Sequence, residues 1–217
     1  MLKAVIFDLD GTLVDSEAVW TKAWTKALKK HEKQYDPALQ KHLMSKPAKE
    51  NFSFLTQTYD LSIEPDEFGR DVVAAYKEIE ESEGVSPKPG VEDFLRALKA
   101  AGAKIAVATS ASRAYVERLF DRLGWTSMFD TIVSTEEVPN GKPAPDVYLK
   151  AVEKLGCDKD GCVAVEDSPN GAASAKAAGL PVLGIIDKRY NDELPGVDDV
   201  TESYLDLSVE RLEKMIK

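Results

Sequence analysis

The chain has 217 residues, 43% hydrophobic and 30% charged, so it can fold as one large or two modest domains of an ordinary soluble protein. Its formal net charge of −10 argues against nucleic acid or an anionic membrane as a partner, because both require a basic surface. No apolar run reaches the roughly 18 residues of a membrane-spanning helix, and no signal peptide precedes the first apolar segment, so we expect a cytoplasmic protein.

The first predicted element is a short buried strand at residues 4–7. Two aspartates, Asp8 and Asp10, follow it directly, and then come Gly11 and Thr12. Open α/β sheets bind their ligands at the carboxyl ends of the strands, which is where these acids lie. Two neighbouring carboxylates repel each other, so either one of them holds a proton or a cation lies between them.

Residues 16–85 contain no convincing strand and are predicted to form a four-helix bundle. The expected helices cover residues 17–30, 37–44, 47–55 and 66–81. Apolar residues recur at helical spacing in the first, and a proline stands at the start of the other three. In the fourth helix, Val72, Val73 and Tyr76 are expected to face the bundle core.

From residue 91 onward, predicted helices and strands alternate strictly. The expected helices are 91–101, 114–123, 146–155, 170–178 and 209–216, and the expected strands are 104–109, 131–134, 162–166 and 181–186. Such alternation predicts an α/β, Rossmann-like fold with a parallel sheet and helices on both faces. The first strand belongs to this sheet. Residues 1–15 and 86–217 are therefore expected to form the core domain, with residues 16–85 inserted as a helical cap domain.

Polar side chains gather where the predicted strands end. They are Asp8 and Asp10 after the first strand, Thr109 and Ser110 after the second, Lys142 after the third, and Glu166 and Asp167 after the fourth. This inventory suits phosphoryl transfer. A carboxylate can act as the nucleophile, carboxylates can bind Mg²⁺, and lysine and backbone amides can neutralise phosphate oxygens.

Four segments carry a resemblance that covers the whole chain. Residues 8–12 (DLDGT) match a D-x-D-G-[TV] motif, Thr109 matches a hydroxyl after the second strand, Lys142 lies within GKPAPD, and residues 165–168 read VEDS. Together they resemble the haloacid dehalogenase superfamily, in its helical-cap branch with β-phosphoglucomutase and phosphoglycolate phosphatase.

The resemblance implies a role for each matching residue. Asp8 would attack phosphorus to form an aspartyl-phosphate, and Asp10 would act as the general acid and base. Thr109, the backbone N–H of Ser110, and Lys142 would bind the phosphoryl group.

The resemblance also implies a Mg²⁺ site. The ion would be held by Asp8, the main-chain carbonyl of Asp10 and Asp167, with Glu166 binding it directly or through water.

Candidate substrate contacts are less specific. They are Glu17, Trp20, Lys46 and Lys49 in the cap, and Arg113 after the second strand. Trp20 stands where β-phosphoglucomutases carry a proton-shuttling histidine, which an indole cannot replace. It could instead stack on a sugar, or simply pack beside Trp24. Arg113 could contact the substrate or lie on the surface at a helix start.

The sequence therefore predicts a Mg²⁺-dependent phosphatase, acting as a monomer on a small phosphorylated metabolite such as a sugar or polyol phosphate through an aspartyl-phosphate. The alternative is a β-phosphoglucomutase-like phosphomutase. Trp20 and the absence of arginine from residues 44–49 weigh against it. A haloacid dehalogenase is disfavoured because it needs no second acid, which Asp10 supplies. A non-catalytic binding protein would not need Asp8, Asp10, Lys142 and Asp167 together.

Overall fold

The computed structural model describes residues 1–43, 46 and 48–216, and the chain in it divides into two compact units. The first unit comprises residues 1–14, 87–188 and 192–217, and the second comprises residues 15–86 with 189–191. That residues 1–15 with 86–217 and residues 16–85 act as separate domains stays a prediction.

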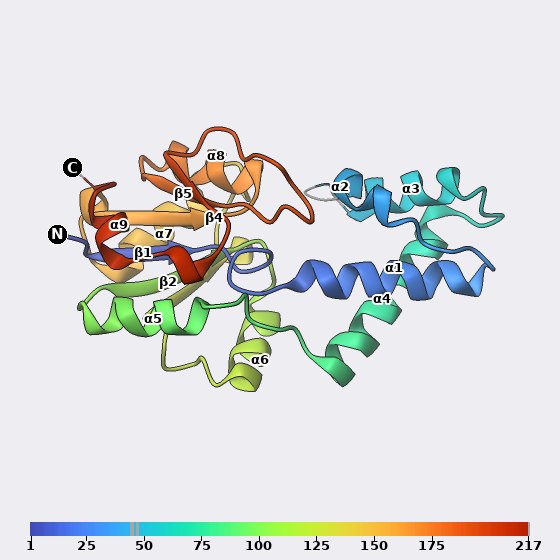
Figure 1. Ribbon diagram of the computed structural model, residues 1–217, viewed down its shortest axis with the longest axis horizontal. Coiled ribbons are helices and arrows are strands. Elements are labelled where there is room, and N and C mark those ends of the chain that lie inside the picture. Colours follow the sequence, from blue (N-terminus) through green and yellow to red (C-terminus); the bar gives the residue numbers. More distant parts are fainter. Residues whose placement is uncertain (44–45, 47, 217) are drawn as a thin grey trace. The chain divides into compact units, whose positions relative to one another are not determined.

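The first unit is built on a sheet of six strands, all parallel, in the order β3-β2-β1-β4-β5-β6. Figure 1 labels β1, β2, β4 and β5 of this sheet. The strands are β1 (Ala4–Phe7), β2 (Lys104–Thr109), β3 (Thr131–Ser134), β4 (Cys162–Glu166), β5 (Val182–Ile185) and β6 (Asp199–Thr201). This order is that of a Rossmann-type sheet, which confirms the predicted fold class. Sequence reasoning missed β6, because a three-residue edge strand is too short for its hydrophobic pattern to be recognised.

Helices cover both faces of this sheet, as predicted. They are α5 (Val91–Ala100), α6 (Arg113–Leu123), α7 (Asp146–Leu155), α8 (Pro169–Ala177) and α9 (Val209–Glu213). Successive strand residues point to opposite faces. Accordingly, Ala4 and Ile6 pack in one cluster with residues of α7 and α8. Phe7 instead meets Phe94 of α5 edge to face, with ring centroids 6.5 Å apart.

The second unit is helical. Its helices are α1 (Ser16–Lys30), α2 (Gln40–Leu43), α3 (Ala48–Thr58) and α4 (Pro65–Glu83), and both α1 and α3 pack on α4. The predicted helix end at Met44 and helix start at Pro47 lie outside the described residues. A short segment from far along the chain joins this unit, since Arg189 forms an ion pair of 2.8 Å with Asp15.

One core prediction for the second unit is wrong. Val72 is fully buried and Tyr76 is half-buried, but Val73 is 38% exposed. Val73 lines an open groove of about 610 Å³ between α3 and α4 instead. The reason is geometric, because adjacent residues of a helix lie about 100° apart and only one of the two valines can face the α1–α4 interface. Among the described residues, no helix is both long and apolar enough to cross a bilayer.

Candidate active site

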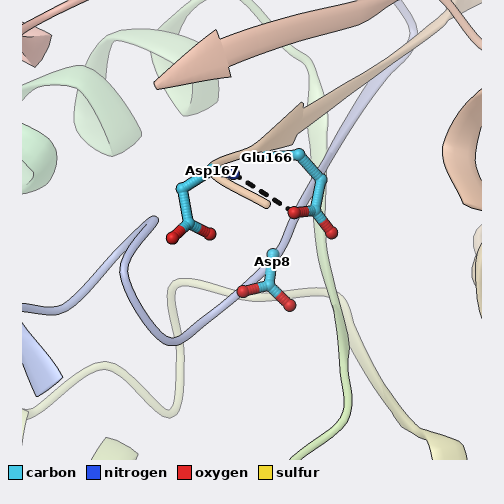
Figure 2. Close-up of side chains that lie close together, drawn as sticks. All are labelled: Asp8, Glu166 and Asp167. Carbon is cyan, nitrogen blue, oxygen red and sulfur yellow. Dashed lines mark hydrogen bonds between the residues drawn. The ribbon is translucent and has the colours of Figure 1, made fainter. Parts of the chain in front are cut away.

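The candidate site forms where the strand order reverses, at the carboxyl ends of β1 and β4. The two strands pair in register, and the backbone N–H of Asp8 extends the ladder by donating to the carbonyl of Val165 at 2.9 Å. Carboxylate oxygens of Asp8, Glu166 and Asp167 therefore lie within 4.8 Å of one another, and Figure 2 shows the three side chains gathered beside the β1 turn. Residues more than 150 positions apart in sequence thus meet because their strands are neighbours.

Lys142 reaches this cluster from the loop that precedes α7. Its side chain is only 6% exposed, and its Nζ donates to Asp8 Oδ1 and to Glu166 Oε1, both at 2.6 Å. A hydrogen bond from α8 helps to hold this loop in place, since Ser174 Oγ donates to the carbonyl of Ala144 at 2.5 Å.

The electrostatics of the cluster are unbalanced. Two carboxylates, Asp8 and Glu166, share the one ammonium group of Lys142. Burial raises the pKa of Asp8 to about 7, because desolvation and the charge of Glu166 outweigh the attraction of Lys142. Burial alone would lower the pKa of Lys142, but the two negative charges raise it, so that lysine stays charged. The excess negative charge suits a cation.

Glu166 is fully buried and saturated with hydrogen bonds. Its Oε1 accepts from Lys142 and, at 2.8 Å, from the hydroxyl of Tyr148. Its Oε2 accepts from the backbone N–H groups of Asp167 and Ser168 and from the Ser168 hydroxyl, at 3.1–3.3 Å. Each oxygen thus already has at least two donors, which is its ordinary capacity.

Asp167 is held by a different contact from those of Glu166. Its Oδ1 accepts a hydrogen bond of 2.9 Å from Thr12, which is buried in the turn after β1. The same turn contains Gly11 at φ +79°, where a Cβ atom would stand 2.1 Å from Asp167 Oδ2. Ser168 caps α8 by accepting from the N–H of Gly171 at 3.1 Å.

The other predicted residues of this unit lie near the same edge. Tyr115 donates to Asp10 Oδ1 over 3.4 Å. Thr109 is buried at the end of β2, and its Oγ1 accepts from the N–H of Ala111 at 3.0 Å. Ser110 is exposed in the loop that follows.

Arg113 lies at the first position of α6 and is engaged locally. Its guanidinium group donates to Glu117 at 2.7 Å and to the carbonyl of Ile132 at 2.9 Å. These contacts give it a structural role on α6 and β3, and contact with a substrate stays a prediction.

The four predicted cap residues belong to the second unit. Glu17 lies in the first turn of α1, and Trp20 packs against Trp24 and Tyr76, with ring centroids 6.2 and 4.4 Å away. Lys46 Nζ lies 2.9 Å from the ring nitrogen of His42, and Lys49 lines the α3–α4 groove. The Trp20 contacts match the helix-packing interpretation, and substrate contact by all four residues stays a prediction.

Sequence reasoning missed two hydroxyl groups of the site, those of Thr12 and Tyr148. Thr12 belongs to the DLDGT motif, but the motif does not predict its hydrogen bond to Asp167. Tyr148 has the apolar spacing of a core residue on α7, and no local signal distinguishes it from a phenylalanine in that position.

Comparison with known proteins places the chain among hydrolases. The family profile described as haloacid dehalogenase-like hydrolase matches residues 5–185. A phosphorylated carbohydrates phosphatase of Thermotoga maritima is 33% identical over 187 residues, covering 85% of this chain and 86% of that protein. A bifunctional riboflavin kinase/FMN phosphatase of Arabidopsis thaliana is 32% identical over 95% of this chain, which spans only 55% of that longer protein.

Among solved structures, a HAD family hydrolase from Deinococcus radiodurans with bound phosphate and sodium superposes with a TM-score of 0.84 at 27% identity. The match covers 100% of this chain and 98% of that one.

Proposed function

The chain belongs to the haloacid dehalogenase-like hydrolase family and is a phosphoric monoester hydrolase, and from this premise we propose that it hydrolyses a small phosphorylated carbohydrate through an aspartyl-phosphate. The observation that supports this most strongly is the contact of 2.6 Å between Lys142 and Asp8, beside Glu166 and Asp167. A buried carboxylate held by a lysine at the ligand-binding edge of the sheet can attack a phosphoryl group whose charge the lysine offsets.

The proposed reaction has two displacements at phosphorus. A carboxylate oxygen of Asp8 bonds to phosphorus as the ester P–O bond breaks, and Asp10 gives its proton to the leaving sugar oxygen. Water then attacks phosphorus while Asp10 takes a proton from it, and the Asp8–phosphorus bond breaks. The balance is phosphate ester plus water giving alcohol plus inorganic phosphate. Lys142, Thr109 and the N–H of Ser110 bind the phosphoryl oxygens.

The donor set fits Mg²⁺, which prefers carboxylate and carbonyl oxygens. Asp8, Asp167 and the main-chain carbonyl of Asp10 would hold it, and the uncompensated negative charge of the cluster favours it. Because each oxygen of Glu166 already accepts from at least two donors within the protein, we propose that Glu166 does not bind the ion directly and acts on it only through its negative charge. When bound, the ion would neutralise charge on the phosphoryl group.

A direct test uses p-nitrophenyl phosphate and a set of sugar and polyol phosphates, with release of inorganic phosphate as the measurement. We expect turnover with Mg²⁺, none in EDTA, and recovery when Mg²⁺ is restored. Asp8→Asn should abolish turnover and phosphoenzyme formation, and Asp10→Asn should leave little. Turnover that persists in EDTA or in Asp8→Ala would refute the metal or the nucleophile assignment, respectively.

A phosphomutase remains the alternative, and its product distinguishes it. We expect inorganic phosphate to accumulate from hexose phosphates, with no isomerised sugar phosphate. Trp20 supports this expectation, because its indole packs against Trp24 and Tyr76 and cannot relay a proton. Accumulation of an isomerised sugar phosphate would replace the phosphatase proposal with the mutase.

A further inference from the structure

Tyr148 has no part in the proposed mechanism, yet it lies against two of the residues that do. It is fully buried on α7, and its hydroxyl donates to Glu166 Oε1 at 2.8 Å. The ammonium group of Lys142 lies 5.1 Å from the centroid of its ring, within reach of a cation–π interaction. Tyr148 therefore contacts both members of the Lys142–Glu166 pair.

The hydroxyl of Tyr148 and the ammonium group of Lys142 share one carboxylate oxygen. Glu166 Oε1 accepts from both, and Glu166 is 0% exposed, so water cannot take the place of either donor. Lys142 in turn divides its hydrogen bonds between Glu166 and Asp8 at equal distances of 2.6 Å. Any change in how strongly Oε1 attracts Lys142 will therefore alter how firmly Lys142 is held toward Asp8.

We propose that Tyr148 is a positioning residue: its hydroxyl orients the Glu166 carboxylate and offsets part of its charge, so that Lys142 stays directed at Asp8 and at the transferring phosphoryl group. This inference rests on the proposed function. Burial and the charge of Glu166 raise the pKa of Tyr148 well above its ordinary value, so its hydroxyl keeps its proton and remains a donor. Without the hydroxyl, Glu166 would draw Lys142 toward itself.

The test is Tyr148→Phe, which keeps the ring and removes only the hydroxyl. With Mg²⁺ and p-nitrophenyl phosphate, we expect kcat to fall about tenfold. Losses of this size are typical of residues that orient a functional group by a hydrogen bond without contacting the substrate. KM should stay within about twofold, because the charge that Lys142 offsets develops in the transition state.

A matched control is Tyr35→Phe. Tyr35 is also buried and donates to a side chain, Gln40 Oε1, at 2.7 Å, but it belongs to the second unit. Its loss should leave kcat and KM within about twofold of wild type. Thermal unfolding of both variants, measured in parallel, separates loss of stability from loss of positioning.

A double-mutant cycle with Glu166→Gln tests whether Tyr148 acts through Glu166. In the Glu166→Gln background the hydroxyl no longer shares an anion with Lys142, so its removal should change kcat less than about twofold. If that background turns over too slowly to measure, ¹⁵N NMR of the Lys142 ammonium group tests instead whether the Tyr148 hydroxyl affects Lys142. The signal, assigned by its absence in Lys142→Gln, should move in Tyr148→Phe and not in Tyr35→Phe.

Two results would overturn the inference alone: an active wild type with kcat unchanged in Tyr148→Phe, or an equal tenfold loss in both backgrounds. A wild type without Mg²⁺-dependent turnover would overturn the proposed function itself, and this is established before any variant is compared.

Discussion

Asp8 is the residue of the site whose charge is most affected by burial and by its charged neighbours. It is buried beside Glu166, and Lys142 cannot neutralise both carboxylates at once. Burial is the main cause that raises the pKa of Asp8 to about 7 from an ordinary 3.8, and the negative charge of Glu166 raises it further against the attraction of Lys142. A buried carboxylate that is only partly neutralised lowers the free energy of unfolding, and functional sites commonly destabilise a protein in this way.

The pH dependence of this cost has a definite sign. Between about pH 4 and 7, folded Asp8 retains a proton that the unfolded chain has released, so its contribution to the free energy of unfolding falls as pH rises. In EDTA, Asp8→Asn should therefore be more stable than wild type at pH 8, by on the order of 2–4 kcal/mol, with the difference vanishing near pH 4. Urea unfolding across this range measures it.

Asp93→Asn serves as the control for that series, because Asp93 is an exposed carboxylate of α5, 85% accessible. Its effect on stability should be small at every pH. A stability difference for Asp8→Asn that does not change with pH would contradict the interpretation.

Among the elements of the fold, two segments of backbone lie very close to the acidic side chains of the site. The turn after β1 brings Gly11 against Asp167, and the first turn of α8 brings Gly171 against Glu166, where a Cβ atom would stand 1.8 Å from Oε1. These elements can hold the two acids at the edge of the sheet only because each lacks a side chain at the point of contact.

Gly11→Ala should therefore abolish most activity. The new methyl group would displace the Asp167 carboxylate, which Gly11 approaches with a positive φ of +79°. Gly156→Ala is the matched control. Gly156 also has a positive φ, +61°, but a Cβ there would meet nothing within 4 Å. We expect both variants to lose about 1 kcal/mol of stability from backbone strain, and Gly11→Ala to lose more because its methyl group also displaces Asp167. Only Gly11→Ala should lose phosphatase activity, and equal activity in the two would argue against the packing role.

At the scale of the whole molecule, the parallel sheet gathers charge from distant parts of the chain. Asp8, Lys142 and Asp167 come from three separate segments, which meet because β1 and β4 are neighbours and the α7 loop passes over their ends. In a protein with a net charge of −10, a phosphorylated substrate needs local positive charge, which Lys142 and a bound cation would supply.

Mg²⁺ should accordingly stabilise the folded protein. At a concentration one hundred times its Kd, a ligand that binds only the folded state adds about 2.7 kcal/mol, or roughly 5–10 °C in Tm at this size. Asp167→Asn should lose this shift, whereas Asp93→Asn should keep it. Differential scanning calorimetry with Mg²⁺ and with EDTA measures both, and an equal shift in Asp167→Asn would exclude Asp167 as a ligand.

Local sequence patterns were enough to predict the α/β class, the alternation of helices with strands, the helices between residues 16 and 85, and the motifs around Asp8, Lys142 and Asp167. All of these features can be recognised from short stretches of sequence, by their hydrophobic period, their turn residues and the polar groups at strand ends. The folded arrangement was needed to show that hydrogen-bond donors enclose Glu166, that Tyr148 is one of these donors, that Val73 is exposed and that β6 exists. This difference arises because the hydrophobic periodicity of a segment indicates only which way a side chain points. Which partner it meets depends on how elements far apart in the chain pack against each other.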